Sequence, residues 1–171
     1  MIIFMQTLEP PHCFSLSAAV GWIELGNPAE AAAELDGIPA ELQKNPAVLD
    51  VRWAICAEEK DWTGGFSVAT ALMDVAPELP SGWLHAAYAI RRMENGGLQQ
   101  ARNLLFPALD KFPNFGLIAY NLACYACQLN QMDEARSLLK RAMATGDKNN
   151  IRNMALQDTD MEALWPEIKN F

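Results

Sequence analysis

A chain of 171 residues is long enough for one domain or one short repeat array, and its 51% hydrophobic and 20% charged residues argue against disorder. The net charge of −8 is unevenly divided, because residues 1–85 carry 3 basic and 12 acidic side chains whereas residues 86–171 carry 10 and 9. The negative first half argues against nucleic acid and anionic lipid as partners, and no basic cluster in the second half changes this expectation. Alanine is abundant and β-branched residues are sparse, so the composition predicts an all-α fold.

The start of the chain, from Met1 to Met5, is apolar but too short for the hydrophobic region of a secretory signal, and no basic residue precedes it. No later apolar run approaches the roughly 20 residues that cross a membrane as a helix. A cytoplasmic location is therefore expected, with reduced thiols at all four cysteines. These are Cys13, Cys56, Cys124 and Cys127.

The first expected helix begins near residue 12 and ends at a turn that also suits the start of a second helix. Gly26 fits the left-handed position after a helix, Asn27 fits an N-cap, and Pro28 fits a first helical turn. Glu30 stands three residues after Asn27, as in a capping box. This segment predicts two helices joined by a tight turn, and similar turns are expected at residues 60–62, 94–97 and 130–133.

The same arrangement of small and large residues recurs at a nearly fixed period. Steps of 34, 34 and 36 residues lead from Ala18-Ala19 to Arg52-Trp53, Ala86-Ala87 and Leu122-Ala123. Each of these pairs is followed by a second set of small and aliphatic residues on the next expected helix. The second sets are Ala31, Leu35 and Ile38; Gly65, Ala69 and Leu72; Ala101, Leu105 and Ala108; and Ala135, Leu139 and Ala142.

This pattern resembles the tetratricopeptide repeat, in which small residues let two antiparallel helices approach closely and neighbouring pairs stack. The resemblance implies an all-α solenoid of about four degenerate repeats, at residues 12–45, 46–79, 80–115 and 116–148, after an N-terminal extension at 1–11. Residues 149–171 are expected to form capping helices, with Leu164 and Trp165 against the last repeat and Pro166 ending the run.

Several residues depart from the repeat pattern. Arg52 stands where the pattern has Leu, and Trp53 stands where it has a small residue, so the second repeat must pack differently. For Arg52 the interpretations are a structural arginine that reaches solvent or a local acid, and a ligand contact. Pro107 falls inside an expected helix and should interrupt it, while Gly37 and Pro39 should shorten another.

The sequence offers little support for catalysis or for a bound cofactor or metal. Cys124 and Cys127 have a redox or metal spacing, but they lie inside an expected helix without a second close pair of ligands, which favours packing. His12 and His85 are the only histidines, and no phosphate loop, nucleophile elbow or HExxH motif occurs. We therefore expect a protein that is not an enzyme and that has no cofactor.

In tetratricopeptide proteins the first helix of each pair lines the concave side, where a peptide or partner helix lies. The resemblance therefore implies a binding groove for a protein or peptide partner of unknown identity. Its expected contact residues are His85, Tyr88, Arg92, Tyr120 and Asn121. The alternative is a structural subunit or self-associating scaffold, and hence a homo-oligomer, that uses its apolar ends, with Trp53 and Trp62 as interface anchors.

Overall fold

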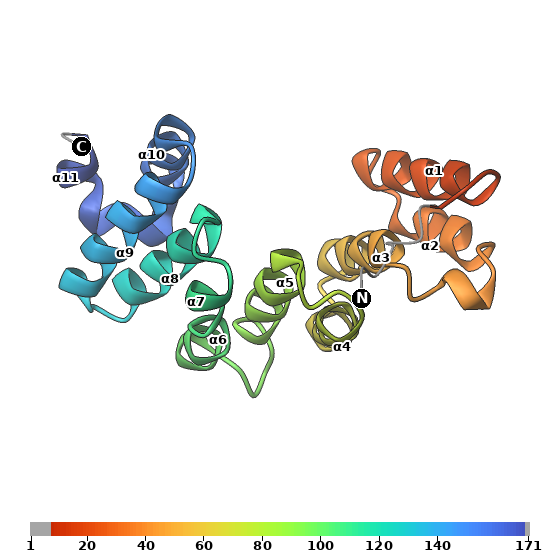
Figure 1. The fold of residues 1–171 in the computed structure, drawn as a ribbon, viewed down its shortest axis with the longest axis horizontal. Coiled ribbons are helices and arrows are strands. Elements are labelled where there is room, and N and C mark those ends of the chain that lie inside the picture. The colour runs from red at the N-terminus through yellow and green to blue at the C-terminus, as the bar shows by residue number, and fades with distance from the viewer. Residues whose placement is uncertain (1–7, 170–171) are drawn as a thin grey trace. The chain divides into compact units, whose positions relative to one another are not determined.

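The computed structural model describes residues 8–169, and over this range every regular element is a helix (Figure 1). This confirms the predicted all-α fold. The expected N-terminal extension falls largely on residues 1–7, which lie outside the described range. Across residues 8–169, no helix combines the length and the apolar character needed to cross a membrane. The chain forms two compact units, of which the first ends at Ala89 and the second begins at Ile90.

The first unit consists of consecutive helices joined by short turns. Helix α1 packs on α2, α3 packs on α4, and both α1 and α2 contact α3. The last residue of α5 belongs to the second unit. The elements are α1 (His12–Glu24), α2 (Pro28–Asp36), a short 3-10 helix η1 (Ala40–Leu42), α3 (Pro46–Glu59), α4 (Trp62–Val75) and α5 (Pro80–Ile90).

The turns within these pairs have the predicted chemistry. Gly26 adopts φ +73°, the Asn27 side chain accepts a hydrogen bond from the Glu30 amide, and Pro28 begins α2. At the next turn Lys60 adopts φ +59°, and the Asp61 carboxylate accepts a hydrogen bond of 2.9 Å from the amide of Gly64. Each turn thus satisfies amide groups that the start of a helix leaves without partners.

The small residues of the repeat pattern allow the helices to approach closely. Ala19 on α1, Ala31 on α2 and Ala69 on α4 are completely buried. Leu35 and Leu72, which the pattern places toward the core, are also completely buried. The burial of both kinds of position explains why the spacing of small and aliphatic residues recurs.

Arg52 has a structural role in the connection between α2 and α3. Its Nη2 donates hydrogen bonds to Gln43 Oε1 at 2.6 Å and to Asp36 Oδ1 at 2.9 Å. The Gln43 amide in turn donates to the backbone carbonyls of Leu35, at 2.7 Å, in the last turn of α2, and of Ile38, at 2.6 Å, just after it. The arginine therefore orients a glutamine that donates hydrogen bonds to one carbonyl in the last turn of α2 and to one just after it.

In the second unit, α8 packs against α9 and also contacts α6 and α7, while α10 packs on α9. The predicted interruption at Pro107 is confirmed, because Phe106 and Pro107 separate α6 from α7. The elements are α6 (Leu98–Leu105), α7 (Ala108–Lys111), α8 (Gly116–Gln128), α9 (Met132–Thr145), α10 (Lys148–Gln157), a 3-10 helix η2 (Thr159–Leu164) and α11 (Trp165–Ile168).

The C-terminal segment is well packed. Met161, Leu164 and Ile168 are buried, and the Trp165 indole donates a hydrogen bond of 2.8 Å to the carbonyl of Ala155 on α10. The expectation that Pro166 ends the run is wrong. Pro166 lies in the first turn of α11, where a missing amide hydrogen costs no hydrogen bond.

Candidate functional site

The five residues expected at the binding groove fall in both units. His85 and Tyr88 lie on α5 within the first unit, whereas Arg92 follows α5 and belongs to the second unit. Tyr120 and Asn121 lie near the middle of α8, also in the second unit. The surroundings of these residues differ strongly between the two units.

His85 is held by contacts with α3. Its Nε2 lies 3.0 Å from Asp50 Oδ1, and its ring stacks on the indole of Trp53 with centroids 3.8 Å apart and planes 11° from parallel. One edge of the imidazole is therefore fixed by a carboxylate and one face by an aromatic ring. Such contacts on two sides keep the side chain in one orientation.

Tyr88 lies one helical turn after His85 and extends the same group of rings. It meets Trp53 edge to face, with centroids 5.6 Å apart and planes at 78°, and its centroid lies 5.8 Å from that of Trp62. The tyrosine remains 38% exposed. We refer to Trp53, Trp62, His85 and Tyr88 together as the aromatic surface.

The repeat pattern places His85 and Tyr88 at the expected groove, whereas Trp53 departs from the pattern and is expected to contact a partner only in the alternative of self-association. This departure could have indicated that Trp53 lies at the surface of the helix pair, because a tryptophan at a position for a small residue cannot fit between closely packed helices. In the structure Trp53 packs against His85 and Tyr88 on α5, and its indole also lies beside Gly65 on α4. The absence of a side chain at Gly65 leaves room for the ring.

Acidic groups gather where α3 ends and α4 begins, next to the aromatic surface in sequence. Glu58, Glu59 and Asp61 are all exposed, and Asp61 directly precedes Trp62. Burial raises the pKa of the Cys56 thiol, and the nearby carboxylates of Asp61 and Glu59 raise it further. We refer to Glu58, Glu59 and Asp61 as the acidic flank.

The corresponding face of α8 in the second unit is covered by the chain itself. Tyr120 is only 4% exposed, and its hydroxyl donates a hydrogen bond of 2.8 Å to Asp158 Oδ2. Two turns further along α8, Gln128 donates to the carbonyl of Asp160 at 3.0 Å. The segment that contains η2 therefore lies along the α8 face that carries Tyr120, Cys124 and Gln128.

A partly buried ion pair anchors this segment. The Arg91 guanidinium donates through both Nη atoms to the Asp160 carboxylate, and the Nη2 bond to Oδ1 measures 3.0 Å. The same guanidinium lies over the ring of Tyr125, with 5.5 Å from Cζ to the ring centroid. The hydrogen bond from Arg91 to Asp160 raises the pKa of the guanidinium, so the arginine stays charged across the ordinary pH range.

The covering segment also explains the chemistry of the cysteine pair. Burial raises the pKa of Cys124 well above its ordinary value, and the carboxylate of Asp158 raises it further. Burial likewise raises the pKa of Cys127, with added effects of Asp160 and Asp158. A thiol of raised pKa is a poor nucleophile and a poor metal ligand at neutral pH, so the pair is suited to packing. No cluster of three or more metal-binding side chains occurs over residues 8–169.

The other two predicted residues of the second unit are less enclosed than Tyr120. The Asn121 side chain donates a hydrogen bond of 2.9 Å to the carbonyl of Leu117 on its own helix. Arg92 is exposed in the turn that follows α5.

Burial raises the pKa of Tyr125 to about 12, and the positive charges of Arg91 and Arg92 oppose this rise.

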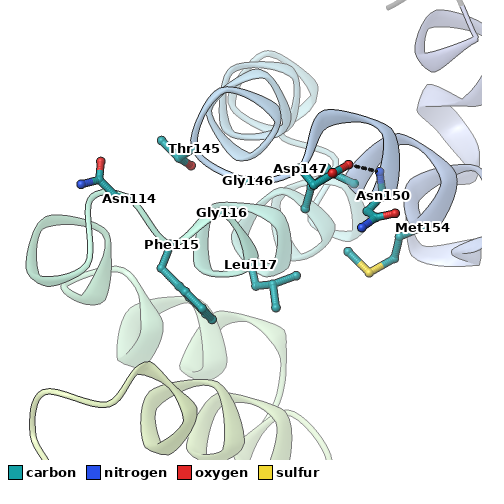
Figure 2. Close-up of a pocket in the computed structure, with 10 residues that line it drawn as sticks. Asn114, Phe115, Gly116, Leu117, Thr145, Gly146, Asp147, Asn150 and Met154 are labelled. Atoms are coloured by element: carbon teal, nitrogen blue, oxygen red, sulfur yellow. Dashed lines mark hydrogen bonds between the residues drawn. The ribbon is translucent and has the colours of Figure 1, made fainter.

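A separate pocket of about 290 Å³ lies in the second unit, between the start of α8, the end of α9 and α10 (Figure 2). Phe115, Leu117 and Met154 contribute exposed apolar side chains to its lining. The polar groups include Asp147, whose carboxylate already accepts a hydrogen bond from the amide of Asn150. The pocket is mainly apolar and was not anticipated from the sequence.

Comparisons with known proteins bear on the fold. No protein-family model matches the chain, and no curated protein matches it. Among solved structures, the chain is similar to a thermophilic TPR protein from Thermus thermophilus, with a TM-score of 0.72 and 19% sequence identity. The alignment covers 92% of this chain and 82% of that one. The helical pairs found here therefore correspond to tetratricopeptide-type repeats over nearly the whole chain.

Proposed function

We propose that this chain, which has the tetratricopeptide-repeat fold, is a non-catalytic protein-interaction module. It binds a peptide or partner helix through the aromatic surface of the first unit. The fold itself is in general a scaffold for protein interactions. The proposal includes a cytoplasmic location, no cofactor, and no nucleic-acid partner. The observation that carries it is the group of rings formed by Trp53, Trp62, His85 and Tyr88, of which Tyr88 is 38% exposed.

Aromatic side chains suit this role because they offer a large contact area and lose little conformational freedom on binding. Here the freedom is already reduced, since the His85 ring is fixed between Asp50 and Trp53 and Tyr88 rests against two tryptophans. A polypeptide that covers such a surface has a smaller ordering cost than one that binds mobile side chains. In the second unit, Tyr120 contributes to binding only if the segment around Asp158 moves away.

The proposal is tested with peptides selected from a random displayed library by the full chain. Calorimetry would then compare the affinity of a selected peptide for the unmodified protein and for Tyr88→Ala, with Phe115→Ala as the control in the second unit. If Tyr88 is a central contact, its removal should weaken binding by roughly thirtyfold, which corresponds to about 2 kcal/mol. An equal affinity for both variants and the unmodified protein would contradict the proposed site.

A second candidate function is self-association through an end of the repeat array. Phe14 on α1 and Leu25 directly after it are 66% and 76% exposed, and large apolar side chains that are this accessible are often covered by a partner. We propose a second copy of the chain as that partner. Light scattering after size-exclusion chromatography should then show a dimer that dissociates in a Phe14→Ser, Leu25→Ser variant, whereas a monomer at all concentrations would exclude this function.

A further inference from the structure

The aromatic surface presents ring faces and edges in an arrangement that suits a cation. Tyr88 contacts two indoles, with centroid distances of 5.6 Å to Trp53 and 5.8 Å to Trp62, and the planes of Trp62 and Tyr88 are inclined by 58°. The face of an aromatic ring carries partial negative charge and attracts an ammonium or guanidinium group placed within about 6 Å of its centroid. Rings inclined to one another can contact the same cation from two directions.

In sequence, carboxylates occur on both sides of Trp53, within α3 and in the turn that follows it. Asp50, whose side chain is 39% exposed, contacts His85 near the start of the helix. The acidic flank lies at the other end of α3, and its members Glu59 and Asp61 are close enough to the Cys56 thiol to raise its pKa. The C-terminal end of a helix also carries partial negative charge, which adds to the field of these carboxylates.

The rest of the first unit does little to neutralise this charge. Residues 1–89 contain 12 acidic side chains and only three basic ones, Lys44, Arg52 and Lys60, of which Lys60 stands between Glu59 and Asp61 in the acidic flank. Of the three, Arg52 is already paired with Asp36 through a 2.9 Å contact. Residues 90–171 are nearly balanced, with 10 basic and 9 acidic side chains, so the excess of negative charge belongs to the unit that carries the aromatic surface.

We infer that the aromatic surface recognises a basic polypeptide segment and seats a lysine or arginine side chain against Tyr88 and Trp62, beside the carboxylates of Asp50 and the acidic flank. This inference rests on the proposed function and specifies its ligand. The rings supply contact area and cation–π attraction, while the carboxylates raise the local concentration of cationic segments and favour their orientation.

The test uses three synthetic peptides of equal length and identical glycine and serine spacing, whose variable positions hold arginine, glutamine or glutamate. Calorimetry or fluorescence anisotropy at low salt should rank the affinities as arginine over glutamine over glutamate, with at least about fivefold between the first two, as a cation–π contact of roughly 1 kcal/mol implies. Raising the salt concentration should weaken the arginine peptide most.

Matched variants separate the two contributions to this preference. Tyr88→Leu removes the aromatic ring with little loss of volume and should reduce the arginine preference severalfold, whereas Tyr88→Phe should retain it. Glu58→Gln together with Glu59→Gln should reduce the salt dependence while leaving the glutamine peptide unaffected. Phe115→Leu in the second unit is the control and should change nothing. Circular dichroism and thermal unfolding would verify that each variant is folded.

Two outcomes would overturn the inference. One is an arginine peptide that binds no better than the glutamate peptide, and the other is an arginine preference unchanged in Tyr88→Leu. Peptides selected from the random library show whether only the basic ligand is wrong or whether the proposed function itself fails. If neutral or acidic selected peptides still lose affinity in Tyr88→Ala, the interaction function stands and only the basic ligand is wrong. If no peptide depends on Tyr88, the proposed function itself fails.

Discussion

The imidazole of His85 lies flat on the indole of Trp53, with ring centroids 3.8 Å apart and planes 11° from parallel. Because the two rings belong to α5 and α3, this stack joins the second and third expected repeats within the first unit. It therefore has a structural role as well as a place in the proposed binding surface.

Loss of the stack should destabilise the first unit. His85→Ala removes both the ring contact and the interaction with Asp50, so urea unfolding should show a free energy lower by about 1–2 kcal/mol. His85→Phe keeps a ring on Trp53 and should recover most of this loss. If His85→Ala is as stable as the unmodified chain, the stack contributes nothing to the fold.

Gly116 should be intolerant of any side chain. A Cβ at this position would lie 2.7 Å from the carbonyl oxygen of Ala142 and 2.9 Å from the amide nitrogen of Gly146, both of which are backbone atoms. Gly116→Ala should therefore lower the free energy of unfolding by about 1–3 kcal/mol, measured by chemical denaturation.

Gly21, in the second half of α1, is the matched control. A Cβ there meets nothing within 4 Å, so Gly21→Ala should leave stability unchanged or raise it by about 0.5–1 kcal/mol through helix propensity. Equal effects of the two substitutions would show that the close approach at Gly116 is not maintained in solution.

Features of the fold that depend on residues close together in sequence could be predicted, whereas features that depend on residues far apart could not. The turn at Gly26, Asn27 and Pro28 was predictable because each residue acts on its own backbone or on a residue three positions away. The break at Pro107 was predictable for the same reason, since a proline inside a helix removes a hydrogen bond locally. The period of the repeat also predicted which helices pair with each other.

The surroundings of the predicted contact residues were not predictable in this way. Tyr120 is covered by Asp158, which is 38 residues away, and nothing in the repeat pattern says that the C-terminal segment returns along α8. Trp53 and His85 are likewise brought together only by the packing of α5 against α3. The sequence could therefore indicate which residues lie on first helices, but not which of them the chain covers.

The C-terminal segment should protect Cys124 from alkylation. Its thiol is buried beside Asp158 and its pKa is raised, so iodoacetamide should modify it far more slowly at neutral pH than the partly exposed Cys13. Arg91→Met removes the ion pair with Asp160 and should speed the modification of Cys124 by about tenfold or more, because local opening becomes easier. Peptide mapping by mass spectrometry gives both rates, and an unchanged Cys124 rate would mean that the ion pair does not hold the segment in place.

The contact between Arg136 and Glu167 should contribute to stability only when the carboxylate is ionised. Arg136 Nε donates to Glu167 Oε2 at 2.8 Å, and this hydrogen bond lowers the pKa of Glu167 below its ordinary value. A lowered carboxyl pKa means that the stabilisation is complete above about pH 4.5 and is lost as the pH falls through the lowered pKa. The difference in melting temperature between the unmodified chain and Arg136→Met should therefore shrink on acidification. A difference that is constant from about pH 7 to about pH 3 would assign it to packing.

The central claim is that a polypeptide ligand binds the aromatic surface of the first unit, and the most direct measurement follows the indole N–H signals of the five tryptophans by nuclear magnetic resonance during titration with a selected peptide. Trp53 and Trp62 belong to that surface, whereas Trp165 donates its indole hydrogen to Ala155 in the second unit. We expect the signals of Trp53 and Trp62 to shift saturably while that of Trp165 stays in place. Saturable shifts of Trp165 with unchanged signals for Trp53 and Trp62 would contradict the claim.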